Sequence, residues 1–136
     1  MKYKVYVYAI AKNEEKFVDR WMNNVNEADG VYVLDTGSTD NTVKKLKAKG
    51  AIVKQKTFTP FRFDVARNES LDMVPKDAEI CLCIDIDEVL EKGWRQKLEK
   101  IWEKDLTRLR YNYIWSFDKY GNPAVNFYSE KIHTRN

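Results

Sequence analysis

The sequence lacks any long apolar run, and it is poor in cysteine and histidine. No apolar stretch approaches the roughly 18 residues that a helix needs to cross a bilayer, and the N-terminus lacks the basic, apolar and small-residue regions of a signal peptide. We therefore expect a soluble, cytoplasmic protein with no transmembrane segment. The two cysteines, Cys81 and Cys83, stand two apart in an apolar run. On a strand they would share one face with their side chains too far apart for easy bridging, so we interpret them as buried reduced thiols rather than metal ligands.

An excess of charge of one sign is also missing. The chain has 24 basic and 21 acidic residues, a net charge of +3, which creates no dominant field for nucleic acid. A run of four lysines, Lys44, Lys45, Lys47 and Lys49, has no aromatic residues among it to stack on bases. We interpret the run as the solvated face of a helix. The alternative hypothesis, a small polyanion-binding protein, is supported only by this run and by the pI near 8.7.

The length and the hydrophobic content bound the organisation of the chain. Its 136 residues, 43% of them hydrophobic, fit one domain with a sizeable core. We find no internal repeat, linker or low-complexity tract. The prediction is one domain over residues 1–136.

Apolar segments alternate with helical patterns through most of the chain. The predicted strands, rich in β-branched or aromatic residues, are 3–11, 31–35, 51–57 and 79–85. Four helices are predicted. Asn13 caps the first, which buries Phe17, Trp21, Met22 and Val25; the second covers about 39–49 and ends at Gly50, and the third covers about 65–74 and ends before Pro75. The fourth covers 93–104 and has a buried stripe of Trp94, Leu98, Ile101 and Trp102. Such alternation predicts an α/β fold with a mainly parallel sheet flanked by helices.

The last part of the chain has a different pattern. Residues 106–117 and 124–133 are typical of strands, and the segment 119–123 between them, KYGNP, has the chemistry of a turn. We therefore expect a β-hairpin at the C-terminal end.

Polar residues gather directly after three of the predicted strands. The stretches are AKNEE after the first, DTGSTD after the second and DIDE after the fourth. Ligands of open parallel sheets bind outside the carboxyl ends of the strands. These stretches are therefore the candidates for a functional site.

The stretch DIDE places three carboxylates, Asp85, Asp87 and Glu88, within four residues. In an extended segment Asp85 and Asp87 point the same way, so the pair could share one divalent cation, or one could bind the metal and the other a hydroxyl. Carboxylate oxygens suit Mg²⁺ or Mn²⁺. An acidic turn that caps the next segment explains the same spacing.

The stretch DTGSTD also has two interpretations. Ser38, Thr39 or Asp40 could cap the second helix while Gly37 permits the turn. That interpretation does not need Asp35, which ends a buried strand and could accept hydrogen bonds from a base or a sugar.

Arg67 lies in a third polar motif, FDVARNESL at residues 63–71. Its guanidinium could clamp a phosphate or pair with the acidic residues of DIDE. A surface or structural ion pair is the simpler alternative.

Together these residues resemble the family-2 glycosyltransferases, which have the GT-A fold and an Asp-x-Asp motif. Four stretches in family order carry the resemblance: AIAKNEE at 9–15, VLDTGSTDNT at 33–42, FDVARNESL at 63–71 and CIDIDEVL at 83–90. The final KIHTRN is similar to the segment that follows in the family. The resemblance implies transfer of a sugar from a nucleotide-sugar donor, and we take a UDP-sugar as that donor.

The resemblance also implies roles for particular residues. The nucleotide pocket would be lined by Ile10, Ala11 and Lys12, and the base would be bound by Asp35. Arg67 would lie near the base or phosphates, and Asp85 would contact the ribose. Asp87, with Asp85 beside it, would bind Mn²⁺ or Mg²⁺. In the family the acceptor hydroxyl, on a saccharide, lipid or protein, attacks with inversion and needs a carboxylate base. The polar groups open to that role are Asp118, Glu130 and His133, and His133 could alternatively help to bind metal.

Family members usually continue well past this length with elements that hold the acceptor and the base. The chain could therefore be a compact enzyme, a C-terminally truncated one, or a nucleotide-sugar-binding module that needs a partner for turnover.

Overall fold

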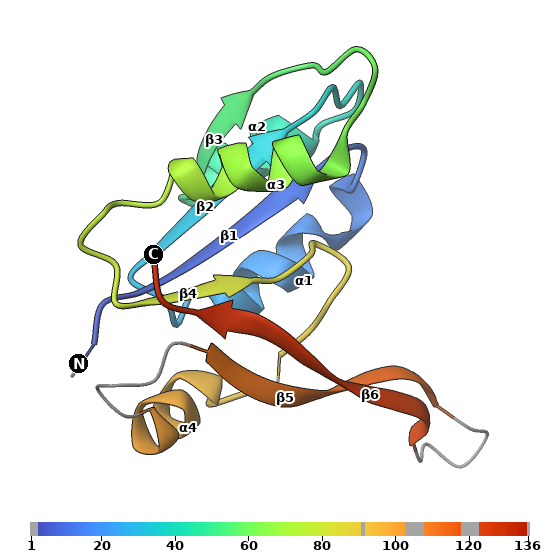
Figure 1. The fold of residues 1–136 in the computed structure, drawn as a ribbon. Helices are drawn as coiled ribbons and strands as arrows, with labels where there is room; N and C mark the ends of the chain where they lie inside the picture. Colours follow the sequence, from blue (N-terminus) through green and yellow to red (C-terminus); the bar gives the residue numbers. More distant parts are fainter. Residues whose placement is uncertain (1–2, 91, 103–107, 118–122, 136) are drawn as a thin grey trace.

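The computed structural model describes residues 3–90, 92–102, 108–117 and 123–135. The strands within these ranges form one six-stranded sheet (Figure 1). The strand order is β3-β2-β1-β4-β6-β5. Four parallel strands, β1 Val5–Ala11, β2 Gly30–Asp35, β3 Ile52–Gln55 and β4 Ile80–Cys83, are followed by the antiparallel hairpin of β5 Arg108–Phe117 and β6 Pro123–His133. The predicted α/β class, with a mainly parallel sheet and a C-terminal hairpin, is confirmed.

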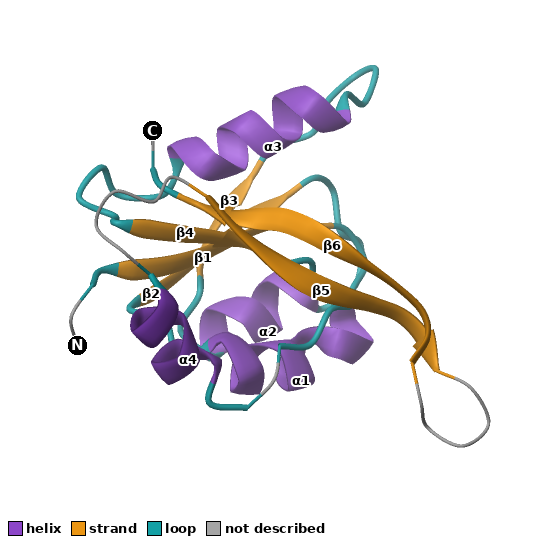
Figure 2. Ribbon diagram, turned by 60° about the horizontal axis from the view of Figure 1, so that its bottom comes forward, coloured by secondary structure: helices purple, strands orange, loops and turns teal. Residues whose placement is uncertain are grey.

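Helices cover both faces of the sheet (Figure 2). The helices are α1 Glu15–Val25, α2 Thr42–Ala48, α3 Phe63–Asp72 and α4 Trp94–Ile101. α1, α2 and α4 lie on one face and α3 lies on the other. The chain order explains this, because β1, β2 and β3 progress in one direction and α3 then carries the chain back to place β4 on the other side of β1. Right-handed crossovers in opposite directions put their helices on opposite faces.

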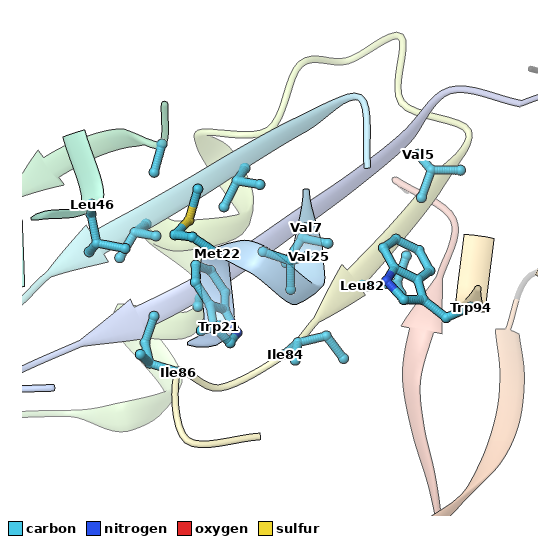
Figure 3. Close-up of a cluster of buried hydrophobic side chains, with 14 of the residues drawn as sticks. Val5, Val7, Trp21, Met22, Val25, Leu46, Leu82, Ile84, Ile86 and Trp94 are labelled. Carbon is cyan, nitrogen blue, oxygen red and sulfur yellow. The ribbon is translucent and has the colours of Figure 1, made fainter. Parts of the chain in front are cut away.

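The larger core lies between the sheet and α1, α2 and α4 (Figure 3). The predicted stripe of α1 is buried at Trp21, Met22 and Val25, while Val18 is fully buried and Phe17 packs at the edge. Each fully buried side chain of this size stabilises the fold by about 1.5–3 kcal/mol. The predicted stripe of α4 is likewise buried at Trp94, Leu98 and Trp102, and the side chain of Ile101 lies outside the described ones.

A smaller core lies on the α3 face of the sheet. Tyr8, Tyr32, Cys81 and Cys83 belong to it, so the two cysteines share one face as predicted. Both are buried, and the described residues contain no disulfide. Burial raises the pKa of the Cys81 thiol to about 11.

The first or last residue of several helices and strands differs from the prediction. β3 ends at Gln55 rather than at 57, α2 begins at Thr42 rather than near 39, and α3 begins at Phe63 rather than near 65. β4 ends at Cys83, before Asp85, because the next residues form a turn. The loop between β3 and α3 is consequently displaced by two residues toward the N-terminus and keeps the predicted length.

The prediction that Asn13 caps the first helix is wrong. Asn13 has a φ of 53°, in the left-handed region that asparagine tolerates, and the residue before α1 is Glu14. The Asn13 Oδ1 accepts a hydrogen bond from the Thr39 N–H at 2.8 Å, and the Asn13 N–H donates to Ser38 Oγ at 2.8 Å. Asn13 therefore joins the loop after β1 to the loop after β2.

Within the described ranges, no helix is both long and apolar enough to span a membrane. The cytoplasmic location stays a prediction. Lys44, Lys47 and Lys49 are exposed on or beside α2 and Lys45 is half-buried, which fits the predicted solvated face, and the absence of nucleic-acid binding also stays a prediction.

Candidate functional site

A hollow of about 510 Å³ lies at the carboxyl edge of the parallel strands. Its lining comes from the segments that follow all four of them: Ile10, Ala11, Lys12 and Glu14; Thr36; Thr57, Phe58, Phe61 and Phe63; Asp85, Ile86 and Asp87. Polar residues of the stretches AKNEE, DTGSTD and DIDE are thus present in the lining, although Asp35 is not among them. Of the candidate binding residues, the hollow brings together Ile10, Ala11, Lys12, Asp85 and Asp87.

The ends of β1 and β2 are joined by hydrogen bonds below the hollow. The Thr36 N–H donates to the Ala11 carbonyl at 2.9 Å, and the Thr36 hydroxyl reaches the same oxygen at 3.4 Å. Ala11 and Thr36 are buried, while Lys12 is exposed. The lining therefore combines a hydrogen-bonded backbone with the exposed cationic side chain of Lys12.

The stretch DIDE divides into two functions. Glu88 is buried, and its Oε1 accepts a hydrogen bond from the Asp85 N–H at 2.8 Å while the Glu88 N–H donates to the Asp85 carbonyl at 2.9 Å. Glu88 therefore fixes the turn, as the acidic-turn interpretation requires. Asp85 and Asp87 line the hollow, and Ile86 between them is buried in the larger core.

Negative charge accumulates at this side of the hollow. Burial and the neighbouring carboxylates of Asp87 and Asp85 raise the pKa of Glu14 above its ordinary value. Glu14 belongs to the candidate stretch AKNEE, but neither its spacing nor the family resemblance gave it a role in the site. A bound cation would relieve this repulsion.

The donor set fits Mn²⁺ or Mg²⁺ with phosphate as a further ligand. Within the part of the chain that the structure describes, no three His, Cys, Asp or Glu side chains form a metal-holding group. Mg²⁺ and similar ions are nevertheless usually bound by only one or two carboxylates together with waters and substrate phosphates. Asp87, whose side chain is exposed in the hollow, and Asp85 supply such a pair.

Asp35 folds its own loop. Its Oδ2 accepts hydrogen bonds from the Gly37 N–H at 3.2 Å and the Ser38 N–H at 2.9 Å, and its Oδ1 accepts one from the Ser38 hydroxyl. Gly37 permits the turn with a φ of 130°. Asp35 is buried and is not among the residues that line the hollow, so its role toward a base stays a prediction.

None of the three predicted caps is the N-cap of α2, which is Asn41, but Asp40 bonds to the first residue of the helix. The Asp40 Oδ1 accepts hydrogen bonds from the Thr42 N–H at 3.0 Å and from the Thr42 hydroxyl. The bond from the Thr42 hydroxyl is the main cause that lowers the pKa of Asp40. The Thr42 hydroxyl also accepts from the Glu14 N–H at 2.9 Å, so this cap reaches the first loop as well.

Arg67 does not line the hollow but stacks on a residue that does. Its guanidinium carbon lies 4.5 Å from the centre of the Phe63 ring. Among the described residues no carboxylate lies within ion-pair distance of Arg67, and its buried Nε has no hydrogen-bond partner. The described residues therefore provide no ion pair for Arg67, and a contact with a phosphate stays a prediction.

Sequence reasoning missed the three phenylalanines of the lining. Phe58, Phe61 and Phe63 follow β3 in the stretch TFTPFRF, residues 57–63. The available signal was the density of aromatic residues between turn-forming ones after a strand. It was missed because the candidate stretches were chosen for polar residues after the other three strands.

Of the three candidate bases only His133 has a described side chain, and it is not among the residues that line the hollow. His133 lies opposite Cys81 in the sheet, its Nε2 is 2.8 Å from the Tyr8 hydroxyl and its Nδ1 is 2.5 Å from the Thr134 carbonyl. Because a carbonyl only accepts, Nδ1 carries a proton, and in the neutral imidazole Nε2 then accepts from the Tyr8 hydroxyl. Asp118 and the side chain of Glu130 lie outside the described residues, so the base stays unassigned.

Comparison with known proteins supplies the family. The model of the family described as glycosyl transferase family 2 matches residues 6–132. An uncharacterized glycosyltransferase of Rickettsia bellii (strain RML369-C) is 35% identical over 99 residues, which are 72% of this chain and 32% of the relative.

Solved structures agree with this assignment. Glucosyl-3-phosphoglycerate synthase from Mycobacterium tuberculosis, in complex with Mn²⁺, UDP and glucosyl-3-phosphoglycerate, matches with a TM-score of 0.52 at 26% identity, over 63% of this chain and 34% of that one. The same enzyme with Mn²⁺, UDP-glucose and phosphoglyceric acid matches with a TM-score of 0.60 at 21% identity, over 79% and 42%, which supports the GT-A fold. The chain thus spans about a third of the length of the curated relative. With the family model covering nearly all of it, the chain belongs to glycosyl transferase family 2.

Proposed function

We propose that the chain binds a nucleotide-sugar donor, with UDP as the nucleotide, in the hollow and acts in the transfer of its sugar to an acceptor hydroxyl. The observation that carries the proposal is the meeting of Asp85 and Asp87 with Ile10, Ala11 and Lys12 at the carboxyl edge of the sheet. The related synthase from Mycobacterium tuberculosis, at 26% identity, has been solved with UDP and Mn²⁺.

The proposed roles follow the chemistry of the lining. Asp85 accepts hydrogen bonds from the ribose hydroxyls, and Lys12 at the rim attracts the diphosphate. Asp87, with Asp85 beside it, holds Mn²⁺ or Mg²⁺. Asp35 positions the base indirectly, by fixing the loop after β2, and any direct bond to the base would use the lone pairs that the loop leaves available.

The proposed reaction is a displacement with inversion. The acceptor oxygen forms a bond to the anomeric carbon, the bond to the diphosphate oxygen breaks, and the acceptor proton passes to a base. A divalent cation held at Asp87 would neutralise the charge that develops on the departing diphosphate. The acceptor is a saccharide, lipid or protein hydroxyl, and the chain acts as one domain of a cytoplasmic protein.

A nucleotide-sugar-binding module without turnover is the second candidate. The observation that favours it is the place of His133, which is bonded to Tyr8 and Thr134 and is not part of the lining. Transfer or hydrolysis of a UDP-sugar by this chain would exclude the module.

The experiment is a calorimetric titration of UDP with and without Mn²⁺ into wild type and Asp87→Asn. Wild type should bind UDP more tightly with Mn²⁺, and Asp87→Asn should lose that gain. Asp19→Asn, an exposed carboxylate on α1 outside the lining, is the matched control and should behave as wild type. Equal binding under all conditions would reject the metal assignment.

A further inference from the structure

Three phenylalanines are among the residues that line the hollow, and we refer to them together as its aromatic wall. This aromatic wall consists of Phe58, Phe61 and Phe63. Phe61 is 52% exposed and Phe63 is 54% exposed. Single exposed apolar residues are ordinary, but a group that faces one concavity marks a place where a ligand is covered.

The aromatic wall is held in place rather than loose. The rings of Phe58 and Phe61 meet edge to face, with centres 6.2 Å apart and planes at 81°. Lys56 Nζ lies 5.4 Å from the centre of the Phe58 ring and is paired with Glu69 of α3. The loop after β3 is thereby tied to the helix behind it.

Phe63 is supported from within α3. Arg67 lies one turn further along the helix and stacks its guanidinium on the Phe63 ring. Phe63 is more than half exposed even with the Arg67 guanidinium against its ring. It therefore retains area for contact with a flat partner. The support reduces the loss of side-chain entropy when such a partner binds.

The hollow therefore has two chemically distinct walls. Asp85 and Asp87 form an acidic wall suited to a metal and its phosphates, and the aromatic wall is suited to a flat ring. A nucleoside diphosphate carries both parts, a flat base and a diphosphate. Asp35, the residue expected to bind the base, is directed into its own loop instead.

We propose that Phe61 and Phe63 stack on the nucleobase of the donor and supply much of its affinity. The proposal rests on the nucleotide-sugar function proposed above and adds a recognition element for the base. Stacking on an aromatic ring contributes about 1–3 kcal/mol per base in other proteins, which corresponds to about fivefold or more in affinity.

The experiment compares UDP with inorganic pyrophosphate, which has the phosphates but no base, both titrated with Mn²⁺. Phe61→Ala and Phe63→Ala should each weaken UDP binding by about fivefold or more and leave pyrophosphate binding unchanged. Phe61→Leu and Phe63→Leu should show a similar loss, because leucine keeps the apolar volume but has no aromatic face. Ile52→Ala, which removes a side chain 56% exposed outside the lining, is the control and should change neither ligand.

Three results would overturn the stacking proposal: unchanged UDP affinity in the alanine variants, full affinity in the leucine variants, or an equal loss for pyrophosphate. Failure of wild type to bind UDP with Mn²⁺ would instead reject the proposed function itself. Both phenylalanines are more than half exposed, so all four variants should fold, which thermal denaturation of each variant would verify.

Discussion

Charged side chains are arranged differently at the amino and carboxyl edges of the parallel strands. At the amino edge, Arg95 is 2% exposed, and it donates to Glu99 at 2.9 Å, to Asp29 at 3.0 Å and to the carbonyls of Glu27 and Tyr3 at 2.8 Å each. At the carboxyl edge, three carboxylates, Glu14, Asp85 and Asp87, line one hollow.

The pKa directions express the same contrast. Burial would raise the pKa of Asp29, but hydrogen bonds from the Val5 N–H and from Arg95 hold it below its ordinary value. Burial and like charges raise the pKa of Glu14. One edge is stabilised by its charges, and the other carries a repulsion that a ligand could relieve, which is typical of functional sites.

Removal of Arg95 should give the largest loss of stability. Arg95→Met keeps most of the volume but leaves the carboxylates of Asp29 and Glu99 without their buried cation, so the free energy of unfolding should fall by about 3–5 kcal/mol. Urea denaturation measures it. Arg62→Met, which breaks an exposed pair with Asp64, is the control and should cost less than about 1 kcal/mol. Similar small losses in both would remove the contrast between the edges.

Ligand should stabilise the carboxyl edge by a smaller amount. UDP with Mn²⁺ at about 100 times the dissociation constant should raise the free energy of unfolding by about 2.7 kcal/mol, because only the folded chain has the hollow. Thermal denaturation with and without EDTA measures the metal-dependent part. The gain should be equal in wild type and in Arg62→Met, and a gain that survives EDTA in full would contradict a metal-linked site.

The Glu88 turn connects stability with the site. Glu88→Ala removes the acceptor of the Asp85 N–H and should cost about 1–3 kcal/mol, with a weaker response of UDP binding to Mn²⁺. Glu88→Gln keeps a carbonyl oxygen at that position and should cost clearly less. If both variants lose the same stability in urea denaturation, the charge of Glu88 and not its hydrogen bond fixes the turn.

The smallest effect should come from Glu14 and should depend on pH. Because its pKa is raised above the ordinary 4.5, the folded chain holds the proton more tightly than the unfolded one. Glu14 thus lowers stability at neutral pH, and this loss disappears as the pH falls through the folded pKa toward 4.5. Glu14→Gln should gain less than about 0.5 kcal/mol at neutral pH and nothing in acid. Denaturation series across this pH range would show a reversed or constant difference if the repulsion were absent.

The order of elements could be predicted from the sequence because periodicity and strand composition are local signals. The same signals placed Asp85 and Asp87 beside Lys12, since parallel strands bring their carboxyl ends to one edge. Individual side-chain contacts between distant segments could not be predicted. Arg95 meets Tyr3 across 92 positions, and nothing local in the fourth helix indicates that partner.

The details of the site were harder to predict for the same reason. Asp35 looked open for a ligand because its bonds to Gly37 and Ser38 depend on the path of the loop. The phenylalanines of the aromatic wall were overlooked because apolar residues after a strand are not in themselves a signal of a site. In both cases the residue types were visible in the sequence, and the direction of the side chain was not.

The bonds of Asn13 have a consequence for local opening. Asn13 binds both Ser38 and Thr39, 25 and 26 positions away, so the loop after β1 cannot open without releasing the loop after β2. In hydrogen exchange, the amides of Asn13 and Thr39 should therefore share one opening free energy and behave as a single cooperative unit.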